Sequence, residues 1–93
     1  MNEPKTFSTQ DLDAIGISRL RSYVERRGWQ RDYSAQKLGT YCYRAVNKPD
    51  YSIYFCDSVF GDYYQRFAEA IADLARAEGK SLVRMYLTLA LGI

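Results

Sequence analysis

One helical stripe in the C-terminal half of the chain constrains the fold most. Large side chains recur there at intervals of four, three, four and three residues, at Phe60, Tyr64, Phe67, Ile71 and Leu74. This spacing predicts a helix with one apolar face, opening at Asp57 and Ser58 and ending at Gly79. The alanines between these residues suit a helix and allow close packing.

Three short segments before this helix are rich in residues that favour β-strands. Large and polar residues alternate from Trp29 to Tyr33, and aromatic and β-branched residues crowd Thr40 to Val46 and Tyr51 to Cys56. The run from Asn47 to Asp50 is a turn signal. Because the connections are short, the three segments are expected to form an antiparallel meander.

One helix is expected before the first strand. Ser18 can cap it and Gly28 can end it, and its apolar residues have the spacing of one helix face: Leu20, Tyr23 and Val24. Residues 1–8 are predicted to be a flexible arm. The S-x-x-D pattern from Ser8 to Asp11 predicts a short helical turn that Gly16 ends.

The last predicted helix is apolar around most of its circumference. It starts after Ser81 and runs to about Leu91, with Arg84 and Thr88 as its polar stripe. In so small a domain, one side of such a helix is expected to lie against another chain. The predicted oligomer interface consists of Val83, Leu87 and Leu91. The alternative is a helix wedged between the sheet and the preceding helix.

These elements predict a single α+β domain over residues 1–93. It would contain a three-stranded antiparallel sheet, preceded by one helix and followed by two. A length of 93 residues has no room for two independent cores. The polar first ten residues do not form a secretory signal, and the apolar stretch of about 12 residues at 82–93 is shorter than the roughly 20 that span a bilayer. A cytoplasmic protein with no membrane partner is expected.

The chain contains no histidine, which excludes several kinds of chemistry. Histidine acid–base catalysis, histidine-activated nucleophiles and histidine-containing metal sites are all ruled out. The two cysteines, Cys42 and Cys56, have no metal-ligand spacing. No catalytic residues, metal or cofactor are therefore expected, and the protein is predicted not to be an enzyme.

The register of the last two strands decides how the cysteines and tyrosines are arranged. A two-residue loop at Lys48 and Pro49 pairs Cys42 with Phe55, whereas a loop one residue longer pairs Cys42 with Cys56 and would permit a disulfide. Free thiols are favoured, because nothing else in the sequence indicates an oxidising compartment. In the shorter-loop register Ile53 and Phe55 face the helices, and one open face carries a predicted aromatic patch of Tyr41, Tyr43 and Tyr54.

Nine tyrosines in 93 residues are more than a core this small can bury. Tyrosine presents a large amphipathic area at low entropic cost and is enriched at protein interfaces. The patch of Tyr41, Tyr43 and Tyr54 is therefore the predicted partner-binding site. The alternative is that strand propensity and placement at the core edge explain the tyrosines.

Basic residues gather in the first half of the chain. Residues 19–48 contain eight basic and two acidic residues, although the whole chain carries a net charge of only +2. With the aromatic residues between them they could contact nucleic acid, weakly and in a salt-dependent way. The candidate contacts are Arg19, Arg26, Arg27, Arg31, Lys37 and Arg44. The alternative is an ordinary solvated surface.

The predicted order of elements resembles the double-stranded-RNA-binding fold as HicA-type toxins use it. The resemblance lies in Val24 to Trp29, a helix end followed by Gly-Trp and a strand, and in Gly39 to Tyr41, where that family has Gly-Ser-His. It covers residues 18–72 and implies this fold and affinity for RNA. The family's ribonuclease activity needs that histidine, and Tyr41 or Cys42 stands here, so the activity is not implied.

The segment from Asp73 to Ser81, with the apolar helix after it, resembles the two helices of ribbon-helix-helix repressors. Those repressors dimerise through such helices and read DNA with a preceding strand, which would be Tyr51 to Cys56 here. This strand lacks the Arg, Lys, Asn or Gln side chains that read base edges. The resemblance therefore implies a helical hairpin rather than DNA reading.

The sequence as a whole favours a small non-enzymatic regulatory protein, such as an inhibitor or an antitoxin-like component. It would bind another protein through the tyrosine-rich surface and form a homodimer through its last helix. The alternative function is nucleic-acid binding by the basic segment 19–48.

Overall fold

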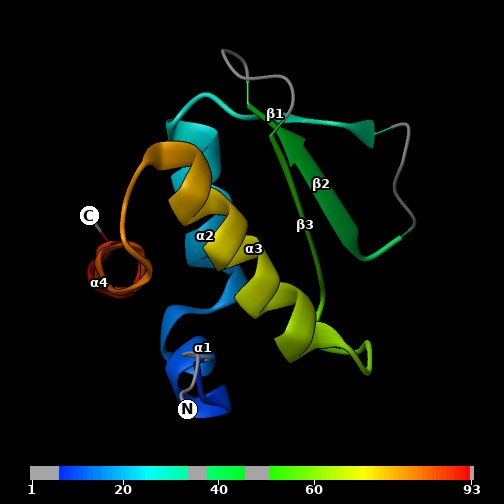
Figure 1. Cartoon of the computed structure of the whole chain (residues 1–93). Helices are drawn as coiled ribbons and strands as arrows, with labels where there is room; N and C mark the ends of the chain where they lie inside the picture. Colours follow the sequence, from blue (N-terminus) through cyan, green and yellow to red (C-terminus); the bar gives the residue numbers. More distant parts are fainter. Residues whose placement is uncertain (1–6, 34–37, 46–50, 93) are drawn as a thin grey trace.

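The computed structural model describes residues 7–33, 38–45 and 51–92. Its strands form one antiparallel sheet in the order β1-β2-β3, and helices lie before and after it in the chain, as the α+β prediction requires. Figure 1 shows the sheet on one side, α2 and α3 beside it, and α4 on the far side. The elements are α1 (Thr9–Ile15), α2 (Ile17–Arg26), β1 (Gln30–Arg31), β2 (Thr40–Arg44), β3 (Ser52–Cys56), α3 (Tyr63–Glu78) and α4 (Leu82–Leu91).

Two helices, not one, precede the sheet in the described residues. The expected Ser8 cap is present: its hydroxyl accepts from the Asp11 amide at 3.1 Å, and the Asp11 carboxylate accepts from the Ser8 amide. This start is a seven-residue helix rather than a short turn, because Leu12 and Ile15 bury its inner side. Ser8 therefore belongs to the fold and not to the arm, of which residues 1–6 lie outside the described part.

Gly16 sets the boundary between α1 and α2. Its φ of +77° cannot continue a right-handed helix, and this conformation suits glycine. The second helix begins directly after it at Ile17, so the prediction of a start capped by Ser18 is wrong. The predicted inner face of this helix is confirmed by the burial of Leu20, Tyr23 and Val24.

The register between β2 and β3 differs from both predicted registers. Cys42 pairs with Tyr54, and Thr40 pairs with Cys56. The Ala45 amide donates to the Tyr51 carbonyl, which leaves residues 46–50 for the connection, longer than the predicted turn. Both cysteines are free thiols, as favoured from the sequence.

The changed register moves Tyr43 from the predicted open patch into the core. Tyr43 pairs with Ile53 and is 1% exposed, and its hydroxyl donates to the Glu25 carboxylate of α2 at 2.6 Å. Its ring stacks on that of Phe55 at 6.0 Å. The prediction that Ile53 and Phe55 face the helices is confirmed, but Tyr43 shares their face instead of opposing it.

The predicted apolar stripe of α3 holds only in its later part. Phe67, Ile71 and Leu74 are buried, whereas Phe60 and Tyr64 are 38% and 39% exposed. The chain after β3 makes turns, and α3 begins at Tyr63 rather than near residue 58. Tyr63 therefore takes the buried position that was assigned to Tyr64. The predicted end of α3 at Gly79 is confirmed.

The turn before α3 packs against the residue that precedes β2. The Phe60 ring lies over Gly39, where a Cβ atom would meet it at 3.0 Å, and Gly39 has a φ of +82°. A glycine is therefore required at this position for both backbone conformation and space. This close approach brings the entry to β2 and the loop before α3 together.

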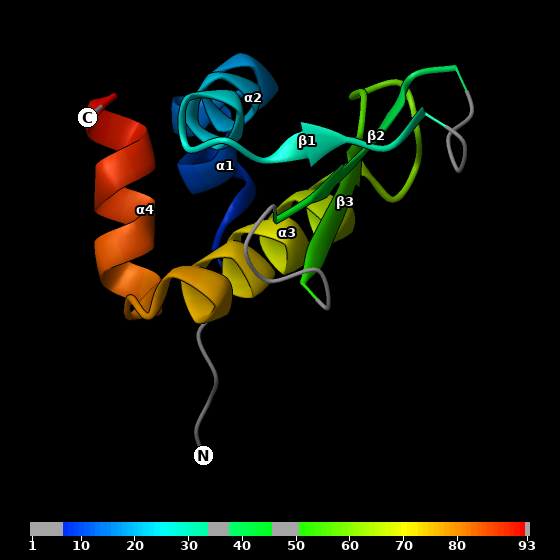
Figure 2. The same ribbon diagram turned by 90° about the horizontal axis from the view of Figure 1, so that it is seen from above.

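The last helix, α4, has the predicted bounds. It does not lie between the sheet and the preceding helix, which was the alternative location considered from the sequence. It packs on α3, α2 and α1, on the side away from the sheet (Figures 1 and 2). The Ser81 hydroxyl caps it by accepting from the Arg84 amide at 3.1 Å. Met85 and Leu89 are buried, so α4 joins the core through one side.

The buried position of Tyr43 generates a stability prediction. Tyr43→Ala should lower the free energy of unfolding by about 3–5 kcal/mol, because it leaves a cavity in the core and removes the hydrogen bond to Glu25. Tyr43→Phe should cost about 1 kcal/mol, since it removes one hydrogen bond. Urea denaturation measures both free energies. The control is Tyr54→Ala, because Tyr54 is 39% exposed. This substitution should cost less than about 1 kcal/mol. Equal losses for Tyr43→Ala and Tyr54→Ala would contradict the register.

Candidate interaction surface

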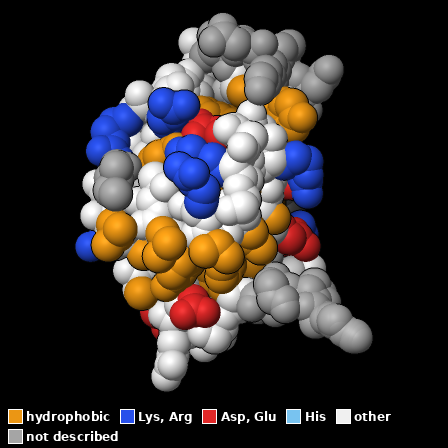
Figure 3. Space-filling model, turned by 60° about the vertical axis from the view of Figure 1, so that its left-hand side comes forward, with side chains coloured by type: hydrophobic (Ala, Val, Ile, Leu, Met, Phe, Trp, Pro, Cys, Tyr) orange, Lys and Arg blue, Asp and Glu red, His pale blue; other side chains and the backbone are white. Residues whose placement is uncertain are grey.

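One side of α4 carries exposed apolar side chains. Val83 is 64% exposed, Leu87 48% and Leu91 69%. They are four residues apart, so they align along one side of the helix, opposite the buried Met85 and Leu89. Figure 3 shows hydrophobic side chains gathered across this face of the molecule. We call Val83, Leu87 and Leu91 the apolar stripe; these are the residues predicted as an oligomer interface.

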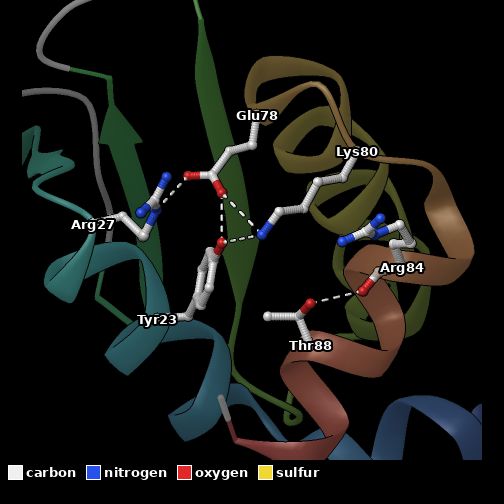
Figure 4. Close-up of polar contacts among 6 residues, drawn as sticks. All are labelled: Tyr23, Arg27, Glu78, Lys80, Arg84 and Thr88. Atoms are coloured by element: carbon white, nitrogen blue, oxygen red, sulfur yellow. Dashed lines mark hydrogen bonds and ion pairs between the residues drawn. The ribbon is translucent and has the colours of Figure 1, made fainter.

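Polar residues follow one edge of the apolar stripe. At 100° per residue, Arg84 lies next to Leu91 around the helix, and Thr88 lies beyond Arg84 toward α2. The Thr88 hydroxyl donates to the Arg84 carbonyl at 2.8 Å, as Figure 4 shows. This edge faces a groove between α4 and α2.

The groove between α2 and α4 is lined by cations. It consists of two adjoining cavities of about 360 and 350 Å³, which share Tyr23, Arg26 and Thr88. Four basic side chains and no acidic one are among its described lining residues. We call it the cationic groove; it is lined by Ser18, Arg19, Ser22, Tyr23, Arg26, Arg27, Lys80, Thr88, Leu89 and Gly92.

A buried carboxylate lies behind one end of the cationic groove. The Glu78 side chain is 8% exposed and accepts from the Tyr23 hydroxyl at 2.5 Å and from Arg27 Nε at 3.1 Å. Lys80 Nζ lies 3.8 Å from the same carboxylate and donates to the Tyr23 hydroxyl at 3.1 Å. Figure 4 shows these four side chains converging from α2, α3 and the turn before α4.

The pKa values of this cluster keep its charges fixed at neutral pH. Burial acts to raise the pKa of Glu78, but hydrogen bonds from Tyr23 and Arg27 and the charges of Arg27 and Lys80 lower it below the usual value. Burial, followed by the hydrogen bond to Glu78, raises the pKa of Tyr23 to about 12. Glu78 is therefore ionised, and Tyr23 keeps its proton and donates it.

The predicted nucleic-acid contacts fall into two separate groups. Arg19, Arg26 and Arg27 line the cationic groove, and Arg19 also donates to the Ala90 carbonyl near the end of α4. The other group lies on the sheet. Lys37 lies outside the described residues.

The sheet group makes contacts of its own. Arg44 Nε lies 3.0 Å from the Asp32 carboxylate, and the Arg31 guanidinium lies 4.7 Å from the centre of the Tyr41 ring. Of the predicted contacts in the described residues, Arg19, Arg26 and Arg27 therefore line the groove, whereas Arg31 and Arg44 lie on the sheet. Lys80 also lines the groove but was not among the residues predicted from the sequence. Its position four residues before Arg84 of the polar stripe was the one sequence feature that could have indicated it.

The predicted tyrosine patch does not form either. Tyr41 is half-buried and donates to the Asp57 carboxylate at 2.9 Å, on the same sheet face as the buried Tyr43. Tyr54 lies on the opposite face, where the Arg66 guanidinium is 5.3 Å from its ring centre. The three residues predicted to bind a partner are therefore divided between the core and both faces of the sheet.

Residues 7–33, 38–45 and 51–92 contain neither a metal-binding cluster nor a membrane-spanning helix. No group of three or more His, Cys, Asp or Glu side chains there could hold a metal ion. No helix in these residues has the length and apolar character needed to cross a membrane.

The lowered pKa of Glu78 generates a prediction on pH and stability. Because the pKa is lower in the folded than in the unfolded chain, Glu78 stabilises the fold above its usual value of 4.5, and this stability is lost as pH falls through the folded pKa. Glu78→Gln should therefore cost about 1–3 kcal/mol at pH 7 and progressively less below about pH 4.5. Urea denaturation between pH 3 and pH 7 measures this difference.

The matched control is Glu69→Gln, on the same helix but with a 51% exposed side chain. It should change the free energy of unfolding by less than about 0.5 kcal/mol at either pH. A Glu78→Gln penalty that did not depend on pH would contradict the ionised cluster.

Comparison with protein-family models, with curated protein sequences and with solved structures gave no match. What the protein does has to be inferred from its own surface, of which the apolar stripe and the cationic groove are the main features.

Proposed function

We propose that this protein is a non-enzymatic interaction protein that binds a helical segment of another protein along the apolar stripe of α4. The observation that carries the proposal is the alignment of Val83, Leu87 and Leu91, exposed by 64%, 48% and 69%. Single exposed apolar residues are ordinary, whereas a contiguous apolar patch of roughly 300 Å² or more is often functional. A row spaced by four residues along a helix matches the ridge that a second helix packs against.

The size of the apolar stripe favours a segment over a second whole subunit. Side chains exposed to this extent present on the order of 300 Å² of apolar surface, against roughly 800 Å² per partner in a stable interface. Two stripes packed on each other would make a small contact. A short helix that also reaches the neighbouring groove would bury more of this face.

The state of the two thiols supports a non-enzymatic role. Burial, followed by the negative charge of nearby aspartates, raises the pKa of both Cys42 and Cys56. Both thiols are therefore protonated at neutral pH, and a protonated thiol is a poor nucleophile. Their environment favours a packing role for these two side chains.

Self-association through the same stripe is the second candidate, because an isologous contact could pair two stripes. Sedimentation of the purified chain at micromolar concentration tests it. The expected result is a predominantly monomeric wild type, in which Leu87→Lys changes nothing. A wild-type dimer that Leu87→Lys converts to a monomer would instead favour the second candidate.

Site-specific photo-crosslinking in the host cell tests the proposed function itself. A photoreactive amino acid at Leu87 should form a discrete adduct with one protein, crosslinked at a helical segment of that protein. The matched control is the same amino acid at Val59, which is 85% exposed but lies far along the chain from α4. The adduct should form at Leu87 and not at Val59.

A variant of the apolar stripe tests whether the Leu87 adduct depends on this surface. Val83→Ser with Leu91→Ser should reduce the Leu87 adduct at least about tenfold, because each removes apolar burial of about 1 kcal/mol or more. An adduct of two copies of this chain, a nuclease-sensitive adduct, or equal adducts at Leu87 and Val59 would contradict the proposed function.

A further inference from the structure

We propose that the partner segment is an acidic amphipathic helix, with its apolar side on the apolar stripe and its carboxylates over the cationic groove. This inference rests on the proposed function and adds the chemistry of the partner. It follows from the position of the groove directly beside the stripe, and from the sign of the groove's charge.

The geometry of α4 joins the two features into one surface. Around the helix, the stripe ends at Leu91, Arg84 follows, and Thr88 then forms part of the groove wall. A helix lying along the stripe would therefore have one edge next to Arg84 and the groove. Figure 3 shows Lys and Arg side chains above the hydrophobic row on this face of the molecule.

The charge of the groove favours carboxylates on that edge. Its described lining contributes four basic side chains, Arg19, Arg26, Arg27 and Lys80, and Arg84 borders it. The nearby Glu78 side chain is 8% exposed and is already bonded to Tyr23 and Arg27. Its single negative charge pairs with Arg27 and Lys80, against the four positive charges of the lining. A carboxylate-bearing edge would complement this field, and a basic edge would be repelled.

The same observations disfavour other occupants. A second copy of this chain would bring another cationic groove on the same face. Single-stranded RNA needs exposed aromatic platforms, whereas Tyr23 is 5% exposed and Tyr86 is stacked on Phe7 at 5.1 Å. An anionic bilayer is flat, whereas these cations line a hollow between two helices. A helical segment can reach both the stripe and the hollow.

Synthetic peptides test the partner chemistry with defined probes. The first is a helical peptide of about 15 residues with leucines along one side and glutamates along one flank. The second replaces each glutamate with lysine, and the third keeps the glutamates and replaces the leucines with serine. The glutamate–leucine peptide should bind the whole chain at least about tenfold more tightly than either matched peptide, and its affinity should fall as salt rises. Fluorescence anisotropy measures all three.

Variants of the chain locate the contact. Arg26→Gln with Arg84→Gln should weaken the glutamate–leucine peptide about five- to twentyfold. The control is Arg76→Gln, a 64% exposed arginine paired with Asp73 on α3, which should leave affinity within about twofold. Leu87→Ser should weaken the same peptide, whereas Val59→Ser should not. Circular dichroism and urea denaturation confirm that each variant is folded.

The outcomes separate this inference from the proposed function. Equal binding of the glutamate and lysine peptides, or no effect of the arginine variants, would overturn the inference. So would tighter binding to a single-stranded RNA oligonucleotide or to phosphatidylglycerol vesicles than to the glutamate–leucine peptide. If crosslinking from Leu87 identifies a helical segment that is neutral or basic, the proposed function stands and the acidic partner is wrong. If crosslinking finds no protein at Leu87, the proposed function itself fails.

Discussion

The buried carboxylate of Glu78 joins the three helices whose arrangement creates the candidate surface. Glu78 is the last residue of α3, where the negative end of the helix dipole disfavours a carboxylate. Tyr23 of α2 and Arg27, which directly follows α2, bond to it, and Lys80 lies beside it. These contacts offset both the dipole and the desolvation of a nearly buried charge. Because Lys80 lies in the turn into α4, the same cluster fixes the start of α4 against α2.

From this junction α4 runs back along α2 in the opposite direction. Arg19, early in α2, reaches the Ala90 carbonyl near the end of α4, whereas Arg27 and Lys80 meet at the other end. This antiparallel packing leaves the cationic groove between the two helices and turns the apolar stripe toward solvent. Under the proposed function, cations beside exposed apolar side chains would also discriminate among partners, because a like-charged partner would be repelled.

The fold was predictable where one local signal matched the tertiary environment. Three such predictions are confirmed: the capping box at Ser8, the end of α3 at Gly79, and the burial of Phe67, Ile71 and Leu74. The failures came from connections. A longer hairpin connection shifted the register and moved Tyr43 into the core, and turns after β3 delayed the start of α3 until Tyr63. Strand pairing depends on connection length, which turn-forming residues alone do not fix.

The sequence by itself determined the three strands, the order of α2, α3 and α4 around them, the absence of histidine chemistry and the apolar character of the last helix. It also grouped Val83, Leu87 and Leu91 as one predicted oligomer interface, and they do lie on one side of α4, because positions four apart share a helix face whatever surrounds them. Only the tertiary structure decided that the basic residues divide between a groove and the sheet, and that Lys80 lies beside Arg26 and Arg27. These residues are more than fifty positions apart in the chain. Their proximity depends on how α4 packs against α2, and no local pattern contains that information.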